Sequence, residues 1–327
     1  MASTVTFAPD ARCSGAGPAG VAAATTLHSC DDRLAMDSPY LALVSGWYAK
    51  HARVLPWREP SASAWSVLVS EVMLQQTPVA RVLPAHAAWL ERWPAPAALA
   101  AATPADAVRQ WDRLGYPRRA VRLHSAARLI VDRHDGLVPD SAEQLRALPG
   151  VGAYTAAAVA SFAYGKRHAV LDTNVRRVLA RLVSGLDRPG PTVSAAERTL
   201  AESLLPVDGR KAARWSVALM ELGALVCTAT RPHCAECPLA AQCTWLARGC
   251  PAGTTRRLAA GYEGSDRQCR GRLLAALRDA DGPVAAGVLA AAWHDSGQRA
   301  RSLAALIADG LVTRCADGAV ALPGDGP

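Results

Sequence analysis

The sequence predicts an all-α protein, and three observations support this fold class. Apolar residues from Tyr40 onward recur every three or four positions, as they do on one face of an amphipathic helix. Glycine and proline separate these periodic segments, as expected where helices end. Strand-like alternation is almost absent before residue 225. We therefore expect a bundle of short helices whose loops bear the functional residues.

Each periodic segment predicts one helix. The expected helices cover residues 40–52, 64–76, 78–92, 104–112, 118–134, 141–147, 153–163, 174–184, 194–204 and 209–225. After a linker at 248–261, helices are expected at 267–278, 285–293 and 299–309, with a hairpin through 311–322. Three helices and a hairpin predict a small C-terminal winged-helix-like module over residues 262–323. Residues 1–38 lack sustained periodicity and are rich in small residues, so we expect a disordered tail there.

Length and charge narrow the class of protein. A chain of 327 residues is long enough for two domains and a small third. Its net charge of +8 suits a polyanionic partner such as nucleic acid. No basic start precedes a long apolar stretch, and no window approaches a membrane span. We therefore expect no signal peptide, no membrane association, and a cytoplasmic, nucleoid-associated location.

Four cysteines with the spacing C-x6-C-x2-C-x5-C form the clearest motif: Cys227, Cys234, Cys237 and Cys243. Four thiolates this close in the chain can hold one 4Fe-4S cluster. A zinc site is the alternative, although zinc motifs more often place two C-x2-C pairs a dozen or more residues apart. A disulfide framework is not expected in a large chain without secretion features. The other cysteines lack ligand-like spacing and are expected to be free thiols.

The segment L-P-G-V-G-A-Y-T-A at 148–156 lies between two expected helices. Gly150 and Gly152 allow a tight hairpin whose backbone N–H groups point outward at a helix N-terminus. Such groups bind a phosphate without reading sequence. An ordinary turn between helices is the alternative. The pattern is typical of a helix-hairpin-helix that binds the DNA backbone.

Two carboxylates stand in informative surroundings. Glu71 is the only ionisable group of the apolar segment V-L-V-S-E-V-M-L-Q-Q-T at 67–77. Burial would raise its pKa, although a lone Glu in such a helix often only faces solvent. Asp172 precedes a helix, where it can be an N-cap or a carboxylate that stays ionised. A protonated carboxyl and an ionised carboxylate are the usual pair for cleaving a glycosidic bond.

Five motifs follow one another in the chain: S-E-V-M-L-Q-Q-T at 70–77, L-G-Y at 114–116, the hairpin, Asp172 with Asn174, and the four cysteines. Their order over residues 39–247 resembles the MutY adenine DNA glycosylases of the endonuclease III (helix-hairpin-helix) superfamily. The segment L-P-W-R at 55–58 fits the resemblance too. The resemblance implies a two-lobed helix-hairpin-helix DNA glycosylase fold. One lobe would comprise 39–62 and 173–247 with the iron-sulfur cluster loop, and the other 63–172.

The resemblance also implies an activity: removal of adenine opposite 8-oxoguanine or guanine in double-stranded DNA, after the adenine is flipped into a pocket. Glu71 would protonate the adenine at N7 and later activate water. Asp172 would stabilise an oxocarbenium-like sugar, aided by Tyr154 and Asn174. The other implied roles are Arg58 and Gln75 in the adenine pocket, Gln76 and Tyr116 in the base stack, and Gly150, Gly152, Arg176 and Arg177 on phosphates.

The position of Tyr154 distinguishes between members of the superfamily. Lyases of this superfamily have a nucleophilic Lys there, and the chain's only lysines are Lys50, Lys166 and Lys211. We therefore expect a monofunctional glycosylase, active as a monomer, with water as the final nucleophile. A pyrimidine-specific or thymine-mismatch glycosylase is the nearest alternative. A redox-sensing DNA-binding regulator and an electron carrier are alternatives from other classes.

Three features depart from the family pattern. Thr173 stands where many members have Gly, and Pro117 where many have a second Tyr. Residues 262–323 are too short for the Nudix-like domain with which bacterial members recognise 8-oxoguanine. Recognition of the lesion strand is therefore expected to differ.

Overall fold

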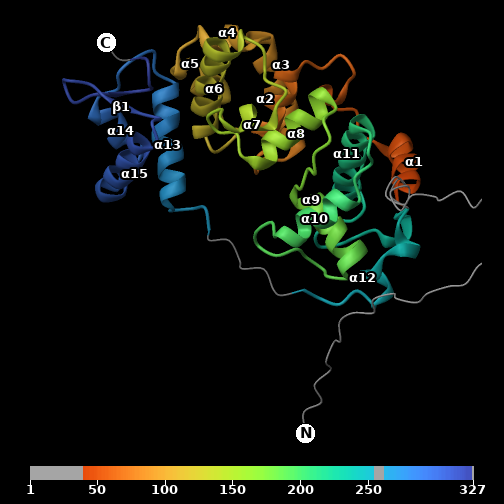
Figure 1. The fold of residues 1–327 in the computed structure, drawn as a ribbon. Helices are drawn as coiled ribbons and strands as arrows, with labels where there is room; N and C mark the ends of the chain where they lie inside the picture. The colour runs from red at the N-terminus through yellow and green to blue at the C-terminus, as the bar shows by residue number, and fades with distance from the viewer. Residues whose placement is uncertain (1–39, 254–260, 326–327) are drawn as a thin grey trace, which may run out of the picture. The chain divides into compact units, whose positions relative to one another are not determined.

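The computed structural model describes residues 40–253 and 261–325, and helices dominate both segments (Figure 1). No helix of these segments is long and apolar enough to cross a membrane. The helices form three groups, of which the first two are interleaved in the sequence. All-α architecture is therefore confirmed for the described part of the chain, apart from one small hairpin near the end.

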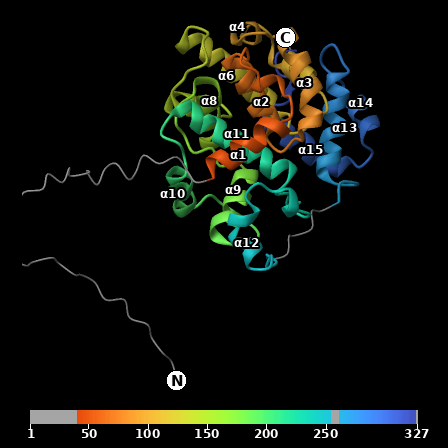
Figure 2. The same ribbon diagram turned by 90° about the vertical axis from the view of Figure 1, so that its right-hand side faces the viewer.

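The first group surrounds α2, Ala64–Leu74, in which every residue from Trp65 to Met73 is buried. Ser63 begins α2 as its N-cap, because its side chain accepts a hydrogen bond from the Ser66 N–H. Helix α2 packs against α3, α6 and α8 within one hydrophobic cluster (Figure 2). A 3-10 helix, Pro56–Arg58, precedes α2 in this group. The helices that follow α2 are α3 (Val79–Arg92), α4 (Pro96–Ala100), α5 (Pro104–Trp111), α6 (Arg118–His134), α7 (Ala142–Arg146) and α8 (Ala153–Tyr164).

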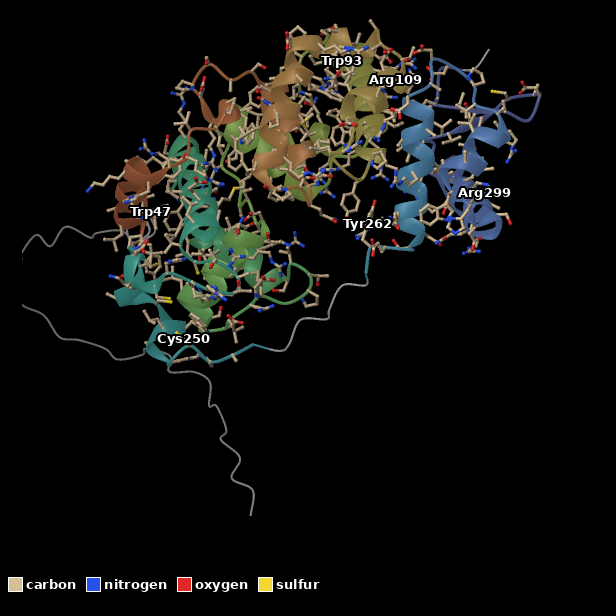
Figure 3. The ribbon with its side chains drawn as sticks, turned by 180° about the vertical axis from the view of Figure 1, so that it is seen from behind. Trp47, Trp93, Arg109, Cys250, Tyr262 and Arg299 are labelled. Atoms are coloured by element: carbon tan, nitrogen blue, oxygen red, sulfur yellow. The ribbon has the colours of Figure 1, made fainter. Side chains whose placement is uncertain are left out.

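Three tryptophans fix α3 against α5. The Trp89 ring meets Trp93 and Trp111 edge to face, with centroid distances of 4.6 Å and 5.6 Å. Trp93, labelled in Figure 3, also accepts a hydrogen bond on its carbonyl oxygen from the Trp65 indole at 3.0 Å. Buried aromatic pairs of this geometry add to the stabilisation from area burial alone. These contacts join the end of α3 to α2 and to α5.

The second group packs around α11, Gly209–Leu225, and has its own hydrophobic cluster, which includes Trp47 (Figure 3). Gly223 lets α9 lie close to α11, because an added Cβ would lie 2.7 Å from Asn174 Cβ. The other elements are α1, Leu41–His51; α9, Thr173–Leu179; a π-helical turn, Ala180–Ser184; α10, Ala195–Ser203; two 3-10 helices, Cys234–Glu236 and Ala240–Gln242; and α12, Thr244–Ala247.

The third group follows residue 260. It contains α13, Asp266–Arg278; α14, Ala286–Ala292; α15, Ser296–Ala308; and the antiparallel strands β1, Thr313–Arg314, and β2, Val320–Ala321. Its buried side chains, such as Leu273 and Leu277, join the hydrophobic cluster of the first group. Arg109 of α5 (Figure 3) donates to Asp325 Oδ1 at 3.0 Å and to the Ala280 carbonyl oxygen at 2.8 Å. This group is therefore packed onto the first one by apolar and polar contacts.

Most predicted helices are confirmed close to their expected ends, and the predicted C-terminal hairpin is present. Helix α4 was not predicted, because a short helix that begins at Pro96 has too few residues to show a helical period. The expected helix at 174–184 ends in a π-helical turn instead of regular α-helix. The expected tail at 1–38 and residues 254–260 of the expected linker lie outside the described residues. Assignment of the third group to the winged-helix class stays a prediction.

Candidate active site

A cavity of about 1650 Å³ is lined by residues of both the first and the second group. Its volume exceeds the range of about 300 to 1,000 Å³ usual for small-ligand pockets, so it has room for a nucleotide with flanking backbone. Ten of the residues predicted from sequence line it: Arg58, Glu71, Gln75, Gln76, Gly150, Gly152, Tyr154, Asp172, Asn174 and Arg176. Tyr116, Arg177 and the four cysteines do not.

Glu71 presents a buried carboxyl to this cavity. Burial raises its pKa from 4.5 to about 7, and the nearby Asp172 carboxylate acts in the same direction. A hydrogen bond from the Tyr154 hydroxyl and the charge of Arg58 partly oppose the increase. The prediction of a buried, proton-holding Glu71 is thus supported by the surroundings of its side chain. The alternative of a solvent-facing Glu71 is wrong, since the residue is only 4% exposed.

Asp172 begins α9 as its N-cap, so the N-cap role predicted for this residue is confirmed. Its carboxylate accepts hydrogen bonds from the Val175 N–H at 2.6 Å and from Asn174 Nδ2 at 2.9 Å. Burial raises the Asp172 pKa, whereas these donors and the Arg177 charge lower it. Burial and these donors thus act in opposite directions on the Asp172 pKa, and an ionised Asp172 stays a prediction. The cap also places the carboxylate in the same cavity as Glu71.

Tyr154 lies in the first turn of α8, directly after the hairpin, and lines the cavity. Burial, together with the charges of Glu71 and Asp172, raises its pKa well above 10. Its hydroxyl therefore keeps its proton at neutral pH. It is a hydrogen-bond donor between two carboxyl groups.

Glu221 of α11 is a fully buried carboxylate that was not among the residues predicted from sequence. Arg53 donates to its two oxygens at 2.7 Å and 2.8 Å, and Arg58 Nη1 donates to Oε2 at 2.9 Å. Burial opposes ionisation, but the hydrogen bonds and charges of the two arginines outweigh it and lower the Glu221 pKa to about 2. Glu221 thereby anchors Arg58 at the cavity wall. The sequence does contain a signal, since Glu221 is a lone carboxylate among apolar residues, as Glu71 is.

The two hairpin glycines have different reasons to be glycine. Gly150 has a φ of +82°, and an added Cβ would lie 2.9 Å from Arg122 Cβ. Gly152 is the N-cap of α8 with a φ of −88°, and a Cβ there would meet nothing within 4 Å. Both glycines are compatible with the expected tight hairpin, but only the backbone of Gly150 requires glycine. Gly152 therefore leaves open space where a side chain would stand, directly before the first turn of α8.

Gln76 and Tyr116 lie on two loops at the edge of the first group. Both are non-glycine residues with positive φ, at 57° and 49°, and both side chains are exposed. Gln75 points inward, and its Nε2 donates to Thr155 Oγ1 at 3.3 Å. Gln75 and Gln76 thus both line the cavity, but Gln75 is hydrogen-bonded within the protein whereas the Gln76 side chain is exposed.

Arg176 and Arg177, predicted to hold phosphates, have acceptors within the protein. Arg176 forms an ion pair with Glu197 at 2.9 Å. Arg177 donates to the Cys227 and Gly223 carbonyl oxygens at 2.7 Å and 2.6 Å, and to Asn174 Oδ1 at 2.7 Å. The Arg176 ion pair connects α9 to α10, and the Arg177 hydrogen bonds connect α9 to α11 and to Cys227. They do not support a phosphate-binding role.

The four predicted cysteine ligands line one small pocket together with Arg181 and Trp245. Arg181 is 2% exposed, and its Nη1 lies 3.4 Å from Cys227 Sγ. Among the described His, Cys, Asp and Glu side chains, no group of three or more is placed to hold a metal ion. The four cysteines line one pocket without forming such a group, and the 4Fe-4S assignment stays a prediction.

Comparison with known proteins shows clear similarities. The family model described as "HhH-GPD superfamily base excision DNA repair protein" matches residues 69–206. The adenine DNA glycosylase of Mycolicibacterium smegmatis is 52% identical over 282 residues, which cover 86% of this chain and 94% of the relative. That of Mycobacterium tuberculosis is 53% identical over 283 residues, covering 86% and 92%. Human adenine DNA glycosylase is 42% identical over 206 residues, covering 60% and 37%.

Solved structures share the fold of the helical part. A thermostable thymine-DNA glycosylase superposes with a TM-score of 0.58 at 25% identity, covering 64% of this chain and 95% of that one. Endonuclease III trapped on DNA superposes with a TM-score of 0.54 at 23% identity, covering 64% and 94%. At this identity the second likeness concerns the fold alone.

Proposed function

This chain belongs to the adenine DNA glycosylases of the HhH-GPD superfamily of base excision DNA repair proteins, and we propose that its substrate is double-stranded DNA with adenine opposite 8-oxoguanine or guanine. The enzyme hydrolyses an N-glycosidic bond. The observation that supports the proposal most directly is that Glu71, Tyr154 and Asp172 face one cavity large enough for a nucleotide. The adenine is flipped from the duplex into this cavity.

Glu71 is the general acid of the first step. With a pKa of about 7, a large fraction of its carboxyl groups hold a proton at neutral pH. That proton passes to N7 of adenine as the bond between C1′ and N9 breaks, and the bonding electrons leave with the base. The sugar then has the positive charge of an oxocarbenium ion. Once deprotonated, Glu71 accepts a proton from the water that adds to C1′, which restores the starting acid.

The ionised carboxylate of Asp172 stabilises the oxocarbenium-like sugar. The Val175 N–H and Asn174 Nδ2 bind its two oxygens, so the carboxylate is held in one orientation when positive charge develops. Tyr154 donates to Glu71 and lies within the field of both carboxyl groups. Arg58, anchored by Glu221, and Gln75 line the adenine pocket.

Water is the final nucleophile, and the enzyme is monofunctional. None of Lys50, Lys166 and Lys211 is among the residues lining the cavity. The position after the hairpin holds Tyr154, whose raised pKa keeps the hydroxyl protonated. Without an amine to attack C1′, the sugar is left base-free and the strand intact.

DNA contacts are proposed at the hairpin and at the two strained loops. The first N–H groups of α8 lie behind Gly152, where open space permits a phosphate to approach. Gln76 and Tyr116 enter the base stack and offset part of the cost of unstacking the adenine. Cys227, Cys234, Cys237 and Cys243, in the segment from the end of α11 to the start of α12, would hold a 4Fe-4S cluster. A cluster bound there would supply a redox-active centre and a cross-link within the second group.

The test is base release from defined duplexes. Purified protein is incubated with duplexes containing adenine opposite 8-oxoguanine, adenine opposite guanine, and thymine opposite guanine, and samples are treated with hot alkali to cut base-free sites. We expect cleavage of the adenine strand in the first two duplexes only, and little nicking before alkali. A normal adenine-thymine duplex is the control.

Three results would contradict parts of the proposal. Equal release of thymine from the thymine-guanine duplex would overturn the adenine specificity. Absence of base release from every duplex would overturn the substrate proposal. A covalent protein–DNA adduct trapped by borohydride would show an amine nucleophile and overturn the monofunctional mechanism.

A further inference from the structure

Arg119 of α6 is a buried arginine whose recorded hydrogen-bond acceptors are all carbonyl or hydroxyl oxygens. It is 7% exposed. Its Nη1 donates to the carbonyl oxygens of Val72, Met73 and Gln75 at 2.9 Å, 2.8 Å and 2.6 Å. Its Nη2 donates to Thr77 Oγ1 at 2.9 Å and to the Gly115 carbonyl oxygen at 2.8 Å, and its Nε to the Tyr116 carbonyl oxygen at 3.4 Å.

The first three acceptors belong to the end of α2. Carbonyl groups of a last helical turn have no partner within the helix, and together they form its negative end. Burial lowers the Arg119 pKa to about 10, so the guanidinium is still charged at neutral pH. Arg119 therefore acts as a C-terminal cap supplied by another helix. Glu71 lies on the same helix, in the turn that Arg119 binds.

The remaining acceptors belong to the loops of the two strained residues. Gln76 and Tyr116 have φ angles of 57° and 49°, a region that costs a non-glycine residue of the order of 1 kcal/mol or more. Such conformations persist only where surrounding contacts enforce them. Arg119 contacts both loops through one planar group, and its Cζ lies 5.0 Å and 5.6 Å from the ring centroids of Trp111 and Tyr116.

We infer that Arg119 is a positioning residue that fixes Gln76 and Tyr116 at one spacing relative to each other and to the helix of Glu71. Its planar guanidinium group has donors for both loops and for the end of α2. The compact ammonium group of a lysine cannot reach all of these acceptors at once. Insertion of the wedges into DNA and placement of the acid are thereby coupled. This inference rests on the proposed wedge role of Gln76 and Tyr116.

The first test measures extrusion of the target base. The fluorescent analogue 2-aminopurine replaces the target adenine opposite 8-oxoguanine, and a Glu71→Gln background prevents excision. We expect the fluorescence rise on binding to be largely lost when Arg119→Lys is added, because the wedges no longer enter together. Arg128→Lys is the matched control, since Arg128 is an exposed arginine of the same helix. An unchanged rise with Arg119→Lys would overturn the inference.

The second test separates positioning from general loss of structure. With Glu71 intact, single-turnover release of adenine opposite 8-oxoguanine should slow at least about tenfold in Arg119→Lys. Adenine opposite a base-free sugar analogue has no pair to break, so the same variant should there lie within about threefold of the parent. Equal slowing on both duplexes would mean that Arg119 only supports the fold. If Arg119→Lys loses its helical circular dichroism signal, Thr77→Val replaces it, because this variant removes only one of the acceptors of Arg119. The same two rates are then compared, and slowing on the 8-oxoguanine duplex alone supports the inference.

Failure of the inference can be distinguished from failure of the proposed wedge role. Gln76→Ala and Tyr116→Ala test the wedges directly in the fluorescence assay. If neither variant lowers the fluorescence rise, the wedge role itself is wrong. If both lower it and Arg119→Lys does not, the wedge role stands and only the role of Arg119 is wrong.

Discussion

Glu71 in α2 and Glu221 in α11 are both buried glutamates among apolar side chains, yet their carboxyl pKa values shift in opposite directions, to about 7 and about 2. Burial acts on both and raises the pKa. Glu221 accepts hydrogen bonds from Arg53 and Arg58, whereas Glu71 has a tyrosine hydroxyl and the more distant charge of Arg58. The difference shows that the partners of a buried carboxyl decide whether it stores a proton or anchors a cation.

The largest expected effect concerns Glu71. Glu71→Gln keeps the shape of the side chain and removes the transferable proton, so adenine release should fall about a thousandfold. Single-turnover kinetics on the duplex with adenine opposite 8-oxoguanine measures the loss. Glu91→Gln, at an exposed position of α3, is the control and should match the parent. A Glu71→Gln protein with substantial activity would assign the acid to another group.

The second effect concerns the anchoring role of Glu221. Glu221→Gln leaves the guanidiniums of Arg53 and Arg58 without their buried counter-charge, which should lower the free energy of unfolding by about 3 kcal/mol or more. Urea unfolding followed by circular dichroism checks this. Glu202→Gln changes an exposed glutamate of α10 and should leave the unfolding midpoint in place. Equal midpoints for Glu221→Gln and the parent would remove the proposed contrast with Glu71.

The third effect is a pH dependence that the Glu71 pKa predicts for stability. A carboxyl whose pKa is raised on folding stabilises the protein fully below its unfolded pKa of 4.5, and that contribution disappears as pH rises through about 7. Glu71→Gln lacks the titration. Its unfolding free energy relative to the parent should therefore rise by up to about 3 kcal/mol between pH 4.5 and pH 8.5.

The same urea series at several pH values measures this difference. Glu91→Gln should track the parent at every pH. A constant gap between Glu71→Gln and the parent across the range would show that the Glu71 pKa is unshifted by folding.

Local signals explain why so much of the fold was predictable. Helix periods and caps involve neighbours in the chain, as in α5, where Thr103 and Asp106 form a reciprocal capping box. The candidate site was predictable where a residue type is unusual for its segment, as for Glu71. The same criterion applied to α11 would have found Glu221. Arg176 and Arg177 show the limit, because nothing in the sequence reveals that this basic pair of α9 has acceptors within the protein.

The sequence by itself determined where most of the helices lie, which turn can expose N–H groups, and which family the motifs resemble, since all of these depend on short-range patterns. Tertiary structure decided which charges are paired. Arg53 meets Glu221 across 168 positions, and Arg119 reaches from α6 to the end of α2 and to two loops. The electrostatics of a buried group depend on neighbours within a few ångströms in space. Those neighbours come from distant parts of the chain, and only the fold brings them together.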